Sequence, residues 1–362
     1  ATEMRGSWFG GRPSTISRGS TSDAERVTYA RVLLVSDLLE FLAGWDLSDG
    51  MIDTIDTVEV DRHLSVVAEQ QLTGVLLAAM RAGEVEVDRP EVVVEAHERA
   101  LAHARLLDTA MLESVEILLD ADITPCLLKG LAIARLLPEL DERISADIDL
   151  LVPTDRLDDA ASAVEAVGAT RSQPAMSPDW ERRFAPSVTI GWRTGTELNL
   201  HRTLAPGPYG HLVDLDELAA STVTVEVDGI DVLTLRPELH LVHAALHIAL
   251  GGVEPRLGDV RDLALLLERT NLDVDRVMRT IVRWGAEAPA AVGFAAAGSI
   301  GARHPIIDWA EAHRPRSRDR RLLASYADRD GRVRRQALAS LTVVPWRDKP
   351  ALLRSLTSRR LG

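Results

Sequence analysis

The sequence predicts an α+β fold in which a small mixed β-sheet lies between an N-terminal and a C-terminal helical region. Apolar residues recur at helical spacing through the first third of the chain, and helical spacing returns from Pro237 onward. Between these regions, the apolar runs are short and separated by turn residues, as expected of at least four strands with two helices. No internal repeat interrupts this order.

The N-terminal helical region is expected to extend from residue 22 to residue 118. Its amphipathic stretches are Val32–Ala43, Leu64–Ala82 and Val92–Leu119, with a break at Asp88-Arg89-Pro90 because proline cannot continue a helix. Residues 1–21 are rich in Gly, Ser and Arg, and we expect them to form a flexible tail.

Residues 119–235 are predicted to form the α/β core, and residues 236–362 the C-terminal helical region. In the core, the apolar run Ile123–Leu128 ends at Lys129-Gly130 and precedes a helical segment, which indicates a strand, a tight turn and a helix. A second buried strand is expected at Ile148–Val152, followed by a helix over 154–167. Two β-hairpins are expected next, Ser187–Trp192 with Glu197–Arg202, and Val223–Val227 with Val232–Leu235.

The composition excludes several classes of protein. With 362 residues, 46% of them hydrophobic, the chain is long enough for two or three packed units and too apolar to be disordered. Cys126 is the only cysteine, so no internal disulfide forms, and we expect a cytoplasmic location. No apolar run reaches the roughly 20 residues of a membrane span, and the first residues lack the apolar region of a signal peptide.

The most informative segment is Asp147-Ile148-Asp149-Leu150-Leu151-Val152. Side chains alternate along a strand, so Asp147 and Asp149 are expected on one face, about 6.6 Å apart along the strand, with Ile148 and Leu150 on the other. Two carboxylates on one face suit a hard divalent cation such as Mg²⁺. The alternative is a polar strand edge with two solvated acids.

The wider pattern resembles the DNA polymerase β nucleotidyltransferase superfamily, and most closely its branch of uncharacterised nucleotidyltransferases. That branch carries a strand ending in Leu-Lys-Gly and an Arg four residues ahead of Asp-Ile-Asp-Leu-Leu-Val, matched here by Leu128-Lys129-Gly130 and by Arg143 with Asp147–Val152. An acid-Leu-His strand and a Leu-x-Asp-Leu-Ala-Leu-Leu-like segment are matched by Asn199-Leu200-His201 and Val260–Leu266. The resemblance covers roughly residues 60 to 300.

This resemblance implies an enzyme that moves a nucleoside monophosphate from an NTP, such as ATP, to an acceptor and releases pyrophosphate. It implies that Asp147 and Asp149 hold Mg²⁺ (or Mn²⁺) ions that bridge the nucleotide phosphates, with a third carboxylate on a neighbouring strand. The chain departs from its relatives here, because Asn199 occupies the third position. Glu197, two residues earlier on the same face, is the alternative ligand.

The departure at Asn199 leaves two hypotheses for the function. The first is a working nucleotidyltransferase in which Glu197 or Asn199 serves the third position, with a hydroxyl of a small molecule or peptide as the preferred acceptor. The second is a catalytically degenerate module that binds a nucleotide or a peptide and regulates a partner. The sequence contains no GxSxG, HExxH or GxGxxG motif to support a rival enzyme class.

Lys129 and Arg143 are the candidate phosphate ligands. Lys129 is one of only two lysines, and Gly130 beside it leaves room for a phosphate at a helix N-terminus. No Walker A motif is present, since Lys129 precedes its glycine. The alternatives are a surface lysine and, for Arg143, a salt bridge to Asp147 or Asp149.

Three histidines, His240, His243 and His247, share one face of a predicted helix and raise the alternative of a zinc site. Packing of this helix is the preferred interpretation, because no second segment with clear zinc ligands accompanies it. Asp259 and Asp262 are candidates for orienting a base or an acceptor, and solvated helix-surface acids are the equal alternative.

The charge distribution bears on macromolecular partners. The chain has 41 basic and 55 acidic residues, a net charge of -14, which argues against broad binding of nucleic acid. Residues 301–362 nevertheless hold 15 basic and 6 acidic residues, 15 − 6 = +9, including the Arg-rich segment 314–321. RNA or an acidic peptide is therefore an alternative partner there, but solvated helix faces are the preferred interpretation and nucleic acid is not favoured.

Overall fold

A seven-stranded mixed sheet occupies the centre of the segment Leu39–Gly362, which forms one of two compact units, the other being Ala1–Leu38. The structure is a computed structural model that describes residues 37–48, 55–137, 145, 147–172, 184–251, 255–326 and 332–357. The α+β prediction is confirmed. The expected tail over residues 1–21 lies outside the described residues, and so does part of the expected helix Val32–Ala43, of which residues 37–43 are helical.

The strands of the sheet all lie within residues 126–235, as predicted. They are β3 (Cys126–Leu128), β4 (Ile148–Leu151), β5 (Thr170–Arg171), β6 (Ser187–Gly191), β7 (Glu197–His201), β8 (Thr222–Val227) and β9 (Ile230–Leu235), in the order β5-β6-β7-β4-β3-β9-β8. The two predicted hairpins are confirmed as the antiparallel pairs β6–β7 and β8–β9. Strand β4 lies at the centre, parallel to β7 and antiparallel to β3.

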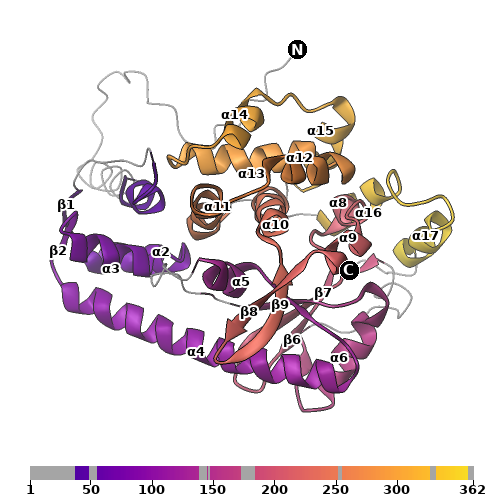
Figure 1. Ribbon diagram of the computed structural model, residues 1–362, viewed down its shortest axis with the longest axis horizontal. Coiled ribbons are helices and arrows are strands. Elements are labelled where there is room, and N and C mark those ends of the chain that lie inside the picture. Colours follow the sequence, from indigo (N-terminus) through magenta and orange to yellow (C-terminus); the bar gives the residue numbers. More distant parts are fainter. Residues whose placement is uncertain are drawn as a thin grey trace, which may run out of the picture. The chain divides into compact units, whose positions relative to one another are not determined.

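Helices cover both faces of the sheet (Figure 1). The long helix α4 (Pro90–Asp120) and α6 (Leu157–Glu165) bury one apolar face, formed by alternate residues such as Ile148 and Leu150 of β4. The opposite face carries Leu128 and Leu151 and packs in the same apolar core as the C-terminal helices. Asp149 belongs to this second face, because it alternates with Ile148 and Leu150.

The C-terminal region is helical as predicted. Helix α10 begins at Pro237 and packs closely against α13. The helices of this region are α10 (Pro237–Leu250), α11 (Leu257–Arg269), α12 (Val274–Arg283), α13 (Glu287–Ser299), α14 (Pro305–Ala312), α15 (Ser317–Ala324), α16 (Arg332–Ser340) and α17 (Lys349–Thr357). None of the helices in the described ranges has the length and apolar character of a bilayer-spanning segment.

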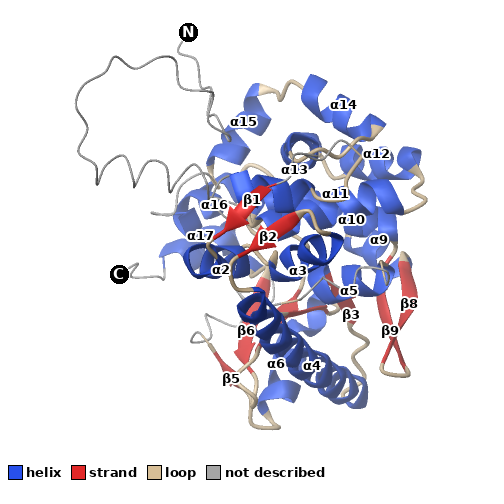
Figure 2. Cartoon of the chain, turned by 90° about the vertical axis from the view of Figure 1, so that its left-hand side faces the viewer, coloured by secondary structure: helices blue, strands red, loops and turns tan. Residues whose placement is uncertain are grey.

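The N-terminal region differs from the prediction in two places. The stretch Leu64–Ala82 is not one helix but two, α2 (Val60–Glu69) and α3 (Thr73–Ala82), with Gln71 at a φ of 60° between them. A small parallel pair, β1 (Ile55–Val58) and β2 (Val85–Val87), also lies beside these helices (Figure 2). Both differences depend on tertiary contacts that no local pattern encodes.

Short elements complete the core. The helix α5 (Lys129–Leu136) follows β3 directly, which confirms the predicted strand, turn and helix. A 3₁₀ turn, η1 (Thr154–Arg156), leads into α6. Two short helices that the sequence analysis did not predict, α8 (Gly207–Gly210) and α9 (Leu215–Ala220), connect β7 to β8.

Candidate functional site

The register of the central strands brings three polar side chains into one row across the sheet. Asp149 of β4 lies opposite Asn199 of β7, and Asn199 lies opposite Thr189 of β6. Side chains of directly opposed residues point to the same face of a sheet. This row therefore points to the face that carries α10 and α11, with Asn199 in its middle and Asp149 on β4, the central strand of the sheet.

Asp149 is buried, with 1% of its surface exposed, and two donors share one of its oxygens. The Lys129 Nζ atom donates to Asp149 Oδ1 at 2.9 Å, and His201 Nε2 donates to the same atom at 2.6 Å. Within the described part of the chain, Asp149 Oδ2 has no hydrogen-bond partner. Lys129 and His201 thus both hold the same oxygen of this carboxylate.

The surroundings of Asp147 and Asp149 shift their pKa values in opposite directions. Burial acts to raise the pKa of Asp149, but the Lys129 ammonium and the His201 hydrogen bond outweigh it, so the pKa lies well below its ordinary value. For Asp147, burial and then the charge of Asp149 raise the pKa. Lys129, His247 and Arg256 oppose this rise, so the Asp147 carboxyl is within electrostatic reach of the same positive groups.

Lys129 has an unusual backbone conformation. Its φ is 52°, in the left-handed region that residues with a Cβ atom rarely adopt. The residue stands between the end of β3 and the first turn of α5, and its side chain is 22% exposed. A strained backbone conformation of this kind persists only where many surrounding contacts stabilise it, and it is frequent at functional sites. The Lys129 conformation is compatible with the ion pair that it makes with Asp149.

The two candidates for the third ligand position differ in their surroundings. Asn199 is in register with Asp149, and its Oδ1 atom accepts a hydrogen bond from Thr189 Oγ1 at 2.7 Å. Glu197 lies at the start of β7 and is exposed. The register thus places the amide, and not the carboxylate, beside Asp149.

The donor set suits a divalent cation that also binds a substrate phosphate. Among the described residues, no three His, Cys, Asp or Glu side chains form a group that could hold a metal ion. Mg²⁺, however, is commonly bound by one or two carboxylates together with substrate phosphates. Asp147, whose pKa is raised partly by the charge of Asp149, and the Oδ2 atom of Asp149 would be two oxygen ligands of this kind. A cation between them would relieve their repulsion.

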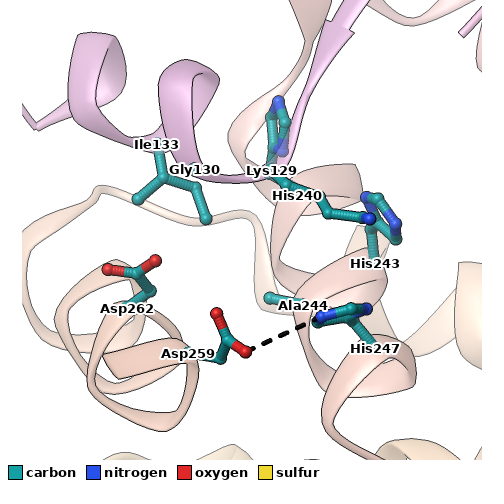
Figure 3. A pocket seen from close by; sticks show the side chains of 9 residues that line it. All are labelled: Lys129, Gly130, Ile133, His240, His243, Ala244, His247, Asp259 and Asp262. Atoms are coloured by element: carbon teal, nitrogen blue, oxygen red, sulfur yellow. Dashed lines mark ion pairs between the residues drawn. The ribbon is translucent and has the colours of Figure 1, made fainter. Parts of the chain in front are cut away.

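A small pocket lies beside Lys129, between α5, α10 and α11 (Figure 3). It measures about 30 Å³, room for one or two water molecules and not for a nucleobase. The three histidines of α10 line it together with Asp259 and Asp262, and His247 Nε2 lies 3.7 Å from Asp259 Oδ2. His240 and His243 are buried, and burial is the main cause that lowers the pKa of each, so both are neutral.

The structure brings most of the predicted residues together. Lys129, Asp147 and Asp149 are mutually close, Gly130 lines the adjacent pocket, and Arg143 lies outside the described residues. His201, which contacts Asp149, was not among the residues predicted from the sequence. Strand alternation could have predicted this contact, because residues 199 and 201 lie on the same face of the strand.

Comparison with known proteins identifies a matching family. Residues 56–300 match the sequence model of a family described as uncharacterised nucleotidyltransferase. The crystal structure of an antigenic nucleotidyltransferase-like protein from Paracoccidioides brasiliensis is 16% identical, with a TM-score of 0.31, over 54% of this chain and 93% of that chain. No curated protein matches. Because the family match spans more than half of the chain, this protein belongs to the uncharacterised nucleotidyltransferase family.

Proposed function

We propose that this protein is a divalent-metal-dependent nucleotidyltransferase. It would move a nucleoside monophosphate from an NTP to a hydroxyl, or a similar group, on a small molecule or peptide, with release of pyrophosphate. The observation that carries the proposal is Asp149: a buried carboxylate with one oxygen held by Lys129 and His201 and the other open, next to Asp147.

In this proposal each residue has a distinct task. Asp147 and Asp149 hold the cation, which when bound neutralises charge on the phosphates. Lys129 and Arg143 bind the triphosphate, and the missing side chain of Gly130 leaves the backbone of α5 open to it. His201 holds Asp149 in place through its hydrogen bond. Asn199, or Glu197 after a side-chain movement, serves the third position.

Nucleotide binding is the first test, since it requires no knowledge of the acceptor. ATP, GTP, CTP and UTP, each with and without Mg²⁺ or Mn²⁺, are added to the full chain in a thermal unfolding assay. A ligand at 100 times its Kd stabilises a protein by about 2.7 kcal/mol, a shift of several degrees. We expect a metal-dependent shift with at least one NTP, lost in Asp149→Asn.

The matched control is Asp155→Asn, which removes an exposed carboxylate just after the same strand. It should leave the shift intact. An Asp149→Asn variant that folds and keeps the full metal-dependent shift would overturn the assignment of Asp149. Transfer itself is then measured as pyrophosphate release with candidate acceptors.

The degenerate binding module is the second candidate, favoured by the position of Asn199. A neutral amide stands in register with Asp149 and is engaged by Thr189. A carboxylate accepts that same hydrogen bond, so Asn199→Asp is compatible with the local structure. A large gain in pyrophosphate release in Asn199→Asp supports a decayed site, whereas a loss shows that Asn199 belongs to the active one.

A further inference from the structure

A second cavity, of about 240 Å³, lies at the other end of the central strands. Its walls are formed by the start of β3, the end of β4, α9 and the β8–β9 hairpin, and they are mainly apolar, including Cys126, Leu151, Leu218 and Leu233. Cys126 and Lys129 are three residues apart along β3, a separation of about 10 Å. This cavity is therefore distinct from the pocket beside Lys129.

Among the described residues that line this cavity, Arg202 is the one with a charged side chain. Arg202 is 6% exposed, and its Nε atom donates to the Ala185 carbonyl at 2.9 Å. No carboxylate of a described residue forms an ion pair with it, and burial alone lowers its pKa to about 10, so it stays charged at neutral pH. A buried cation without a counter-charge is unfavourable unless a ligand supplies that charge.

The shape and chemistry of the cavity indicate what would supply it. The guanidinium of an arginine presents paired N–H donors that match a carboxylate or a phosphate. The remaining walls favour an apolar body, and a cavity of about 150 Å³ is already large enough for benzene. The occupant would thus have an anionic head at Arg202 and a hydrocarbon part among Leu151, Leu218 and Leu233.

We propose that this cavity is a binding site for a small amphiphilic anion, a carboxylate or phosphate monoester with an apolar body of medium-chain length. The site is independent of the proposed nucleotide binding. Along the chain, Arg202 directly follows His201, the partner of Asp149.

Calorimetric titration of the full chain with three probes of equal chain length tests the proposal. Octanoate and octyl phosphate carry the two anionic heads, and 1-octanol is the neutral control, each kept below the concentration at which it aggregates. We expect at least one anion to bind with 1:1 stoichiometry. The affinity of 1-octanol should be lower than that of this anion by a factor of about ten or more. The stronger of the two anions identifies the head group.

Two variants separate the head from the body of the ligand. Arg202→Met keeps an apolar stem but removes the charge, so anion affinity should fall to that of 1-octanol. Ala219→Trp, at the exposed rim of the cavity, should block all three probes. Arg193→Met, which removes an exposed guanidinium in the turn between β6 and β7, is the control and should bind like the wild type.

Three outcomes would overturn the proposal. The first is that neither anion binds with 1:1 stoichiometry. The second is that 1-octanol binds as tightly as the anions, and the third is that the anion affinity of Arg202→Met equals that of the wild type. If Arg202→Met does not fold, the Ala219→Trp variant tests the proposal instead. Unchanged binding of the probes to Ala219→Trp would show that they bind outside this cavity. Nucleotide-induced thermal shifts are unaffected by any of these results, so the two proposals fail separately.

Discussion

Lys129 Nζ and Asp149 Oδ1, brought together by the antiparallel pairing of β3 and β4, are 2.9 Å apart. Asp149 is almost completely buried, whereas the Lys129 side chain is 22% exposed. The partly exposed Lys129 ammonium thus stabilises the charged form of the buried Asp149 carboxylate. Lys129 therefore contributes to the stability of the fold through Asp149.

Removal of the Lys129 charge should therefore destabilise the protein. In Lys129→Met, Asp149 keeps only the His201 hydrogen bond, and we expect a loss of about 3 kcal/mol in the free energy of unfolding, the low end for buried pairs because Lys129 is partly exposed. Urea unfolding measures this loss. The double variant Lys129→Met/Asp149→Asn should recover part of it. Lys349→Met, at the other lysine, is the control, and an equal loss there would contradict the prediction.

The buried histidine His240 should make the protein acid-sensitive. Burial lowers its pKa to about 3, and its Nε2 atom is 2.7 Å from Thr234 Oγ1. Below pH 6.5 the unfolded chain binds a proton here that the folded protein excludes, so stability falls as the pH drops from about 6.5 toward 3. The expected slope for this one group approaches about 1.4 kcal/mol per pH unit.

Urea unfolding at a series of pH values tests this dependence on His240. In His240→Gln, whose amide can still donate to Thr234, the slope between pH 6 and 4 should decrease. The exposed His103 offers a matched substitution, His103→Gln, that should leave the slope as in the wild type. Identical slopes in His240→Gln and the wild type would show that another group governs the acid sensitivity.

The single cysteine should be unreactive in the folded protein. Cys126 is 7% exposed, and burial raises the pKa of its thiol to about 12. At pH 8 the thiolate fraction is then on the order of 1 in 10,000. We expect the native protein to react with dithiobis(nitrobenzoate) far more slowly than the protein in concentrated urea, and Cys126→Ser gives the blank. Equally fast labelling of both states would show that the thiol is accessible.

The crossing of α10 and α13 should not tolerate a side chain at Gly293. A Cβ atom there would lie 2.4 Å from the Ala245 carbonyl oxygen and 2.6 Å from its Cα atom. Gly293→Ala should cost about 1–3 kcal/mol, because the backbones must separate. Thermal unfolding measures the cost. Gly298→Ala on the same helix meets the side chains of Ile307 and Glu311 and no backbone atom, so its cost should be clearly smaller, and equal costs would count against the backbone clash.

Much of the α/β core could be predicted because its strands and turns depend on short sequence patterns. Alternation placed Ile148 and Leu150 on one face and Asp149 on the other, and the turn Asp228-Gly229 has φ values of 50° and 80°, as a two-residue hairpin turn requires. These features depend on a few neighbouring residues. The family match over residues 56–300 agrees with the motif-based resemblance, while the roles of the individual motif residues stay predictions.

Other features depend on residues that are distant in the sequence. The break between α2 and α3 is such a case, because Gln70 Oε1 and its carbonyl oxygen accept hydrogen bonds from Leu257 and Gly258 at the start of α11. Nothing near Gln70 predicts α11 as a partner. The hydrogen bond between His201 and Asp149 likewise required the parallel pairing of β4 with β7.

By itself, therefore, the sequence determined the α+β class, the order of most helices and strands, and Lys129, Asp147 and Asp149 as candidate site residues. Periodicity and turn chemistry are local, and each is set by the backbone preferences of a few residues. Only the tertiary structure decided which strands are neighbours, that Asn199 and not Glu197 lies beside Asp149, and that Arg202 is buried without a carboxylate partner among the described residues. These relationships arise from packing, which joins surfaces that no short segment contains.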